Sequence, residues 1–347
     1  MNASVLAVLD GYWQQSILRS LGVLAAVLLP AGTFVYVYLF KMVSFMQSRL
    51  GPMEAGPFGS MQLLAEVGKF LQKEDIVPDR ADKRLFKLAP YLVVGTVLLV
   101  YLAVPFGPDA LFADLNGGVF YILAVSSISA LGVLLAGWAS ANKYSLIGGL
   151  RAAGQLIAYE LPMVLAVVGV VIQAGTMNLN GIVMAQAQGE IFGLSAIGNP
   201  YVLTQFVGFL IFLIAVQAEL GQTPFDMPIA ESELVTGYIT EYSGLRFLLF
   251  FIGEFASAGA FAAVAATLFL GGWAVPDAWA DLNSNVFNVL GPIILLTKMM
   301  IIGGLIFFVR FTFPRFREDQ LQKLAWTVLI PISLANIMVT TILKVAF

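Results

Sequence analysis

Apolar stretches of eighteen residues or more recur along the whole chain, and they constrain the fold more than any other feature. A helix of about 20 apolar residues crosses the roughly 30 Å hydrocarbon core of a bilayer. The sequence therefore predicts an all-α polytopic membrane protein with about eight transmembrane helices, forming a single membrane domain over residues 1–347. The predicted spans are 17–40, 88–105, 119–141, 152–174, 201–218, 247–270, 286–309 and 324–347.

Composition excludes several classes of function. Of the 347 residues, 59% are hydrophobic and only 11% are charged, less than half the charged share of ordinary soluble proteins. The chain has no cysteine and no histidine, the usual ligands of iron–sulfur clusters, haem and zinc, so we expect no cofactor bound covalently or by metal ligation. Gly68-Lys69 lacks the upstream glycine of a phosphate-binding loop, which argues against ATP hydrolysis by this chain.

Basic residues in the loops predict the orientation, because cytoplasmic loops of membrane proteins are enriched in Lys and Arg. They follow the first, third, fifth and seventh predicted spans, whereas the loops after the even-numbered spans contain none. Both termini are therefore expected on the periplasmic side of a bacterial membrane. The basic residues are Lys41, Arg49, Lys69, Lys73, Arg80, Lys83, Arg84, Lys87, Lys143, Arg151, Arg246, Arg310, Arg315, Arg317 and Lys323.

The first predicted cytoplasmic loop contains a stretch with helical periodicity over residues 58–71. One side of this stretch is formed by Phe58, Met61, Leu64, Val67 and Leu71, and charged side chains lie toward the other side. A helix with this pattern lies in the membrane interface or packs against the helical bundle. The pattern alone does not choose between the two arrangements.

Charged residues within or at the ends of the predicted spans are the first candidates for function. Each costs roughly 2.5–3.5 kcal/mol to place at the centre of a membrane helix, so such residues face the bundle interior. There they act in proton relays, or they form static Glu–Lys pairs that hold helices together. Both interpretations are open for the residues concerned, which are Glu160, Glu219, Glu254 and Lys298.

The loop after Glu219 continues this series of charges. It contains prolines, which interrupt helices, and it mixes apolar residues with further carboxylates. We expect an acidic path from the cytoplasmic interface into the bundle, with a merely solvated loop as the alternative. The polar residues of this loop are Asp226, Glu231, Glu233, Tyr238, Glu241 and Tyr242.

The same loop carries the clearest family signature. Pro224-Phe225-Asp226-Met227-Pro228 is followed by Ala230-Glu231-Ser232-Glu233-Leu234-Val235 and then by Thr240-Glu241-Tyr242-Ser243-Gly244. These blocks closely resemble the signature loop of the H-subunit family of respiratory complex I, the proton-pumping NADH–quinone oxidoreductase. Arg49-Leu50-Gly51-Pro52 and Lys143-Tyr144-Ser145 look like further blocks of that family. The resemblance covers the chain from about Gln47 to the C-terminus.

The resemblance implies a membrane subunit without an electron carrier and without catalysis of its own. It would lie between a peripheral electron-transfer arm and a pumping membrane arm, in a bacterial inner membrane or a thylakoid membrane. Its partners would be other subunits, lipid and quinone, the substrate, but not nucleic acid. The implied coupling residues are Glu160, Glu219, Asp226, Glu231, Glu233, Glu241, Glu254 and Lys298. The implied quinone-cavity residues are Arg49, Phe58, Met61, Leu64, Asp226 and Tyr238.

Several positions depart from the family pattern. The first span ends Phe40-Lys41-Met42 where the family usually has Glu-Arg-Lys or Glu-Arg-Arg. Gln222 stands in place of an arginine, Ile229 in place of a glutamate and Ile239 in place of a histidine. Near Ser127, a glutamate of many members is missing. These changes predict a less polar quinone pocket.

Two other functions compete with this one. A homologous subunit of a membrane-bound hydrogenase or ferredoxin-dependent complex would explain the changes at Phe40, Gln222 and Ile229. A free-standing cation or proton transporter would use the same buried carboxylates but predicts an internal repeat, and the sequence shows none.

Overall fold

The computed structural model describes residues 3–108, 110–190, 198–276 and 286–346, and the elements in these ranges are helices. Seven of the described segments are long and apolar enough to cross a membrane, so the chain is an all-α, multi-pass membrane protein. They are Ser20–Met46, Lys83–Ala103, Gly118–Ala139, Lys143–Ala174, Gly244–Phe269, Phe287–Thr312 and Glu318–Ala346. A shorter apolar helix, Phe206–Glu219, lies between the fourth and the fifth of these segments.

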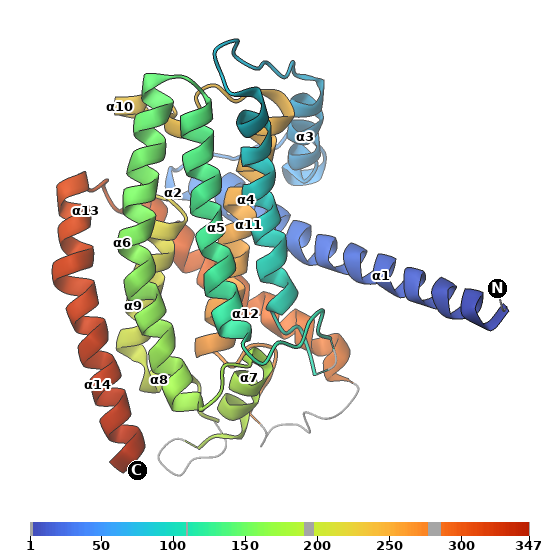
Figure 1. The fold of residues 1–347 in the computed structure, drawn as a ribbon, viewed down its shortest axis with the longest axis vertical. Coiled ribbons are helices and arrows are strands. Elements are labelled where there is room, and N and C mark those ends of the chain that lie inside the picture. The colour runs from blue at the N-terminus through green and yellow to red at the C-terminus, as the bar shows by residue number, and fades with distance from the viewer. Residues whose placement is uncertain (1–2, 109, 191–197, 277–285, 347) are drawn as a thin grey trace.

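The centre of the molecule is a bundle of roughly parallel helices (Figure 1). Helices α4 (Lys83–Ala103), α5 (Gly118–Ala139) and α6 (Lys143–Ala174) pack side by side in sequence order. Helix α11 (Gly244–Phe269) packs against α4 and against α12 (Phe287–Thr312). These helices surround the functional residues discussed below.

Helices at the two sides complete the arrangement. Helix α9 (Phe206–Glu219) and helix α14 (Ile330–Ala346) both lie against α6. Helix α1 (Ala3–Phe34) runs away from the bundle on the opposite side, so the N-terminus lies apart from the packed helices (Figure 1). The short elements are η1 (Val35–Met42), α2 (Val43–Met46), η2 (Pro57–Gly59), α3 (Gln62–Gln72), α7 (Leu179–Gln188), α8 (Tyr201–Thr204), α10 (Glu231–Leu234), η4 (Gly237–Ile239), α13 (Glu318–Leu324) and η5 (Ala325–Leu329).

Small residues let the helices approach closely, as is usual in membrane bundles. A Cβ atom added at Gly137 of α5 would lie 3.0 Å from the Cα of Gly149 on α6 and 2.5 Å from the carbonyl oxygen of Ser145. Helix α11 presents a buried series of alanines from Ala256 to Ala266. The α5–α6 pair is therefore joined almost backbone to backbone.

One predicted span is interrupted. Residues 201–218 form two helices, α8 and α9, because Gln205 adopts a non-helical conformation with φ −115° and ψ 39°. Its buried amide donates to Thr340 Oγ1 at 2.7 Å and accepts from Asn336 Nδ2 at 2.9 Å. The break thus coincides with a polar link to α14, which the apolar pattern of the span did not reveal.

Helix α3 lies beside α11 with the predicted apolar side pointing outward. Phe58, Met61 and Leu64 are 72%, 53% and 65% exposed. Another edge of α3 contacts the bundle, where the ring of Phe70 stacks on Phe247 with centroids 5.4 Å apart. An exposed apolar side on a helix whose other side packs on the bundle is the arrangement of an interfacial helix.

Candidate functional site

Two adjoining cavities lie where the loop between α9 and α11 meets the bundle. The smaller, of about 80 Å³, lies among α4, α5, α6, α9 and α11, and the larger, of about 200 Å³, lies toward the loop and α12. They share five lining residues, so at most a single layer of side chains lies between them. The shared residues are Gly221, Ile229, Tyr238, Phe250 and Glu254.

The loop is held in place by contacts with segments distant in sequence. The ring of Phe225 lies between those of Tyr159 and Phe316, at centroid distances of 5.2 Å and 5.6 Å. The backbone N–H of Phe316 donates to the carbonyl of Pro224 at 3.0 Å. The loop is thereby fixed between α6 and the segment that follows α12.

Two glycines permit the close packing of this loop. Gly237 has φ +58°, and a Cβ atom there would lie 1.8 Å from the carbonyl oxygen of Pro228, so no other residue fits. A Cβ atom at Gly148 of α6 would lie 2.7 Å from the same oxygen and 2.7 Å from the backbone nitrogen of Tyr238. The loop therefore rests directly on the backbone of α6.

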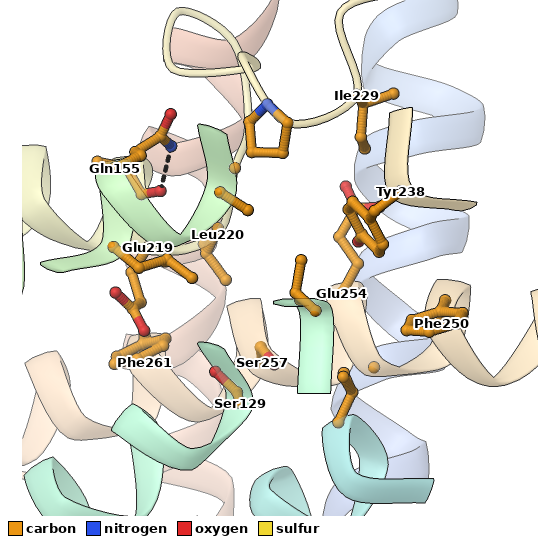
Figure 2. Close-up of a pocket in the computed structure, with 18 residues that line it drawn as sticks. Ser129, Gln155, Glu219, Leu220, Ile229, Tyr238, Phe250, Glu254, Ser257 and Phe261 are labelled. Carbon is orange, nitrogen blue, oxygen red and sulfur yellow. Dashed lines mark hydrogen bonds between the residues drawn. The ribbon is translucent and has the colours of Figure 1, made fainter. Parts of the chain in front are cut away.

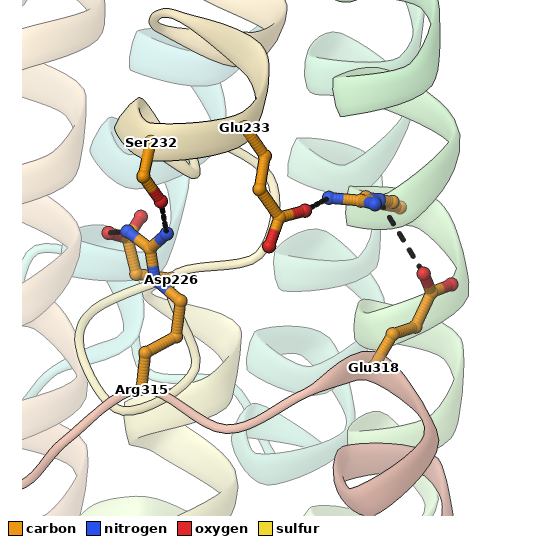
Figure 3. Close-up of polar contacts among 6 residues, drawn as sticks. Asp226, Ser232, Glu233, Arg315 and Glu318 are labelled. Carbon is orange, nitrogen blue, oxygen red and sulfur yellow. Dashed lines mark hydrogen bonds and ion pairs between the residues drawn. The ribbon is translucent and has the colours of Figure 1, made fainter.

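The carboxylates at the loop end of the site are paired with arginines (Figure 3). Arg315 binds Asp226 at 2.8 Å and also donates to Ser232 Oγ at 3.2 Å. Arg151 binds Glu233 at 2.7 Å and Glu318 at 3.5 Å, linking the loop to α6 and α13.

The two paired carboxylates differ in their proton affinity. Burial raises the pKa of Asp226, and the nearby Arg315 only partly opposes this increase. At the more exposed Glu233, the hydrogen bond from Arg151 lowers the pKa instead. Asp226 is thus the loop carboxylate nearer to exchanging a proton.

Two more carboxylates reach the cavities from the membrane helices. Glu254 of α11 lines both cavities and is bound by Arg310 of α12 at 2.9 Å. Glu219, at the end of α9, lines the smaller cavity together with Ser129 and Ser257 (Figure 2). Together with Asp226, these residues form a series from the loop into the bundle.

The remaining predicted coupling residues are described one by one. Glu231 lines the larger cavity and is exposed. Glu160 accepts a hydrogen bond from Ser127 Oγ, and Glu241 accepts one from Asn142 Nδ2 at a surface groove. Lys298 donates to the carbonyl oxygens of Gly272 and Ala274, at 2.8 Å each, near the C-terminal end of α11.

The predicted quinone-cavity residues form two groups. Asp226 and Tyr238 line the larger cavity, and burial raises the pKa of Tyr238, so its hydroxyl stays protonated. Phe58, Met61 and Leu64 belong to the outward side of η2 and α3 described above. Arg49 is exposed, and its Nε donates to Gln47 Oε1 at 2.7 Å.

Three of the positions that depart from the family pattern lie around one cavity. Gln222, Ile229 and Ile239 all line the larger cavity, whereas Phe40 is buried in η1. Compared with the family pattern, the wall of this cavity has therefore lost a charged or ionisable side chain at three positions. This clustering was not visible in the sequence, where the three positions are separate.

Sequence reasoning missed the cations that pair with the carboxylates. From the sequence, Arg310 and Arg315 were used only as evidence for orientation, although their place at the end of a predicted span was a usable signal. One of the two interpretations of the sequence paired Lys298 with a carboxylate. In the structure, Arg310 is the partner of Glu254. Within the described ranges, no group of three or more Asp, Glu, His or Cys residues could hold a metal ion.

Comparison with known proteins agrees with the helical architecture and the loop signature. The family model described as NADH dehydrogenase matches residues 18–341. The chain belongs to the NADH dehydrogenase family. A member from Brevibacillus brevis is 45% identical over 325 residues, covering 92% of each chain. A Bacillus cereus member is 44% identical over 310 residues, 88% of this chain and 87% of its own. Both are named as the H-subunit of an NADH-quinone oxidoreductase.

The Asp226–Arg315 contact gives a stability test with a matched control. Arg315→Met should lower the free energy of unfolding by roughly 1.5–3 kcal/mol, the usual value of a hydrogen bond to a charged group, because Asp226 loses its cation. Arg317→Met should have little effect, since Arg317 and Asp319 are paired in solvent, with side chains 82% and 69% exposed. Denaturant unfolding of the detergent-solubilised protein measures both.

The pH dependence of the Arg315→Met effect checks its cause. Burial raises the folded-state pKa of Asp226, and loss of Arg315 raises it further. The destabilisation should therefore be full above that pKa and should shrink as the pH falls through it, when Asp226 becomes protonated and needs no cation. A loss that does not change with pH would contradict the electrostatic explanation.

Proposed function

We propose that this chain is the H-subunit of a proton-translocating NADH–quinone oxidoreductase in a bacterial inner membrane. It helps to bind quinone and couples quinone reduction to proton movement, while other subunits hold the electron carriers. The observation that carries this proposal is the series Asp226, Glu254 and Glu219, which follows two adjoining cavities from the loop into the bundle.

The carboxylate series suits proton transfer better than static pairing. Ionisable groups inside a membrane protein are costly, and lining an internal cavity is one of their commonest arrangements. Glu219 faces a cavity with two serine hydroxyls, and Tyr238 supplies a neutral hydroxyl between the cavities. Hydroxyl and carboxyl groups both donate and accept protons when they are protonated.

The quinone role is supported by the chemistry at the loop and at α3. The outward Phe58, Met61 and Leu64 offer an apolar surface to an isoprenoid tail, whose burial contributes about 25 cal/mol per Å². The headgroup would meet Asp226 and Tyr238 in the larger cavity. Because Ile229 and Ile239 supply no polar group there, the site suits a headgroup that needs few polar contacts.

The first test removes the exchangeable proton of Glu219. In the assembled complex, Glu219→Gln keeps the side-chain volume but should lower proton translocation by about 10²-fold, the lower end of what a positioned proton-transfer group contributes. Glu190→Gln, at an exposed carboxylate outside the two cavities, is the control and should pump normally. Proton uptake by sealed vesicles during NADH oxidation is the measurement, and normal pumping by Glu219→Gln would favour static pairing.

The proposed orientation places both termini in the periplasm, because the loops that contain the basic residues then lie in the cytoplasm. Ser4→Cys should react with a membrane-impermeant maleimide added to intact spheroplasts, and Asp319→Cys should react only after lysis. The chain has no native cysteine, so its background labelling is nil. Labelling of Asp319→Cys from outside would overturn this orientation.

A second function is favoured by one observation, the neutral residues at Gln222, Ile229 and Ile239. They fit a homologous subunit of a hydrogenase or ferredoxin-dependent complex with an altered quinone site. Purification through a tag on this chain separates the two. We expect an NADH-oxidising module and bound quinone; a nickel–iron hydrogenase or ferredoxin-docking module without quinone would replace the first proposal.

A further inference from the structure

A groove on the outside of the bundle is almost entirely apolar. It lies between α9 and α12, which both pack against α11, and it has a volume of about 350 Å³. Among the twelve described residues that line it, Gln217 alone has a polar side chain, and its Nε2 donates to the carbonyl oxygen of Thr223 at 2.8 Å. The groove therefore offers its contacts to a hydrocarbon chain and not to a polar molecule.

The groove opens toward the surroundings of the bundle. At its rim, Leu210 of α9, Leu305 of α12 and Phe313 are 43%, 46% and 53% exposed. Its floor includes Phe225 and Ile306, which are each 3% exposed. Water does not occupy such a space, because it needs polar partners, and an empty groove would forfeit the dispersion contacts of its lining. A flexible apolar chain from the membrane satisfies both conditions.

The size of the groove excludes a transmembrane helix of a partner as the group that fills it. One turn of a helix, about 10 Å across and 5.4 Å long, takes up about 420 Å³. The groove holds about 350 Å³ in all. The groups slender enough to enter it are a lipid acyl chain, an isoprenoid tail or a single side chain.

Basic side chains lie at the loop end of the groove. Arg317 directly follows the lining residue Phe316, and both Arg317 and Lys323 are exposed. Lys323 directly precedes Leu324, another lining residue. Each basic residue thus has its Cα atom about 3.8 Å from that of a lining residue. The ammonium group of Lys323 has no hydrogen-bond or ion-pair partner in the part of the chain that the structure describes.

The carboxylates beside these cations do not cancel their charge. Glu318 is bound by Arg151 at 3.5 Å. Asp319 lies 3.3 Å from Arg317, but this pair is exposed to solvent, where such pairs contribute little. A phosphate group can therefore be bound by Arg317 and Lys323 through charge-assisted hydrogen bonds. A neutral quinone headgroup or an apolar side chain gains nothing from the cations, whereas an anionic phospholipid uses both the cations and the groove.

We propose that the groove between α9 and α12 binds an acyl chain of an anionic phospholipid, and that Arg317 and Lys323 bind its phosphate. Basic pockets between membrane helices on the cytoplasmic side bind anionic headgroups, and the proposed orientation places this end of α12 there. The lipid site is separate from the surface proposed for the quinone tail, because the described lining of the groove includes no residue of η2 or α3.

The position of the groove connects the lipid with the loop between α9 and α11. The acyl chain lies against Pro224 and Phe225, the two residues that precede Asp226. The ring of Phe225 packs on Tyr159 and Phe316, so the lipid completes its apolar surroundings. A lipid that binds the folded protein and not the unfolded chain stabilises the fold by mass action. The bound lipid therefore supports the loop at the base of its carboxylates.

Photochemical labelling of the assembled complex locates the lipid. The probe is a phosphatidylglycerol with a diazirine in its acyl chain, added to the complex in phosphatidylcholine nanodiscs, and mass spectrometry identifies the labelled residues. We expect labels on the groove residues of α9 and α12, and their loss when unlabelled phosphatidylglycerol replaces part of the phosphatidylcholine.

Four results of this experiment would overturn the proposal. The first is the absence of label from the groove. The second is a label that persists after the replacement, because the groove would then hold any acyl chain without regard to its headgroup. The third is displacement of the label by quinone. The fourth is a structure of the assembled complex in which a side chain of a partner fills the groove.

A charge variant tests the headgroup contact. Lys323→Gln should raise the phosphatidylglycerol concentration needed for half-maximal labelling roughly fivefold, the value of one lysine near an anionic lipid surface. Lys143→Gln, at an exposed lysine of a different surface groove, is the matched control and should not change that concentration. Arg317→Gln combined with Lys323→Gln should remove the preference for phosphatidylglycerol. An unaltered preference in this double variant would contradict the proposal.

A steric variant tests the acyl-chain contact. Leu213→Trp on α9 fills the groove with an indole ring and leaves both cations in place, so labelling of the groove should be lost. Val207→Trp, on the same helix but outside the described lining, is the control and should be labelled normally. Normal labelling of the groove in Leu213→Trp would overturn the proposal. If Leu213→Trp does not assemble, the result for Lys323→Gln decides, because Lys323 is exposed and its replacement leaves the packed helices intact.

The unfolding midpoint gives a second measure of binding. Phosphatidylglycerol should raise the midpoint of the parent complex and of Val207→Trp, because it binds their folded state. It should raise that of Lys323→Gln less, and that of Leu213→Trp not at all. An equal increase in all four would show that the lipid acts elsewhere, and the proposal would be wrong.

The proton path and the lipid site can fail separately. If Glu219→Gln pumps normally while the groove is labelled as expected, the path is wrong and the lipid site stands. If Glu219→Gln stops pumping and the groove takes up no labelled lipid, the path stands and the lipid site is wrong.

Discussion

Buried irregular backbone must have its polar groups satisfied within the protein, and this constraint governs the whole site. The loop between α9 and α11 meets it with groups from distant segments. Gln155 of α6 donates to the carbonyls of Ala218 and Phe225, and Phe316 donates to Pro224. The positions of the loop carboxylates depend on these contacts.

The sequence predicted the helices well because span length and apolar character are local properties. It also located the carboxylates, since a charge in an apolar stretch is conspicuous. It did not show the break at Gln205 or the carbonyl partners of Lys298, because both depend on which helices are neighbours. The pairing of Glu254 with Arg310 was hidden for the same reason.

The distribution of charge within the site has a consistent physical form. Arginines bind the carboxylates at the loop end and on α11, whereas Glu219 lies farther inside among hydroxyls and an amide. Compared with the family pattern, the neutral residues Gln222, Ile229 and Ile239 remove both positive and negative charge from one cavity. The change removes groups of both signs, so it alters polarity more than net charge.

The close contacts at glycine have a mechanical consequence. Where Gly137 lies against Gly149, and Gly148 against the loop backbone at Pro228, no side chain separates the backbones of α5, α6 and the loop. These contacts restrict the sliding of the three parts past one another. A displacement that accompanies turnover is easier elsewhere, and the non-helical joint at Gln205, between α8 and α9, is a place where the chain can bend without separating these contacts.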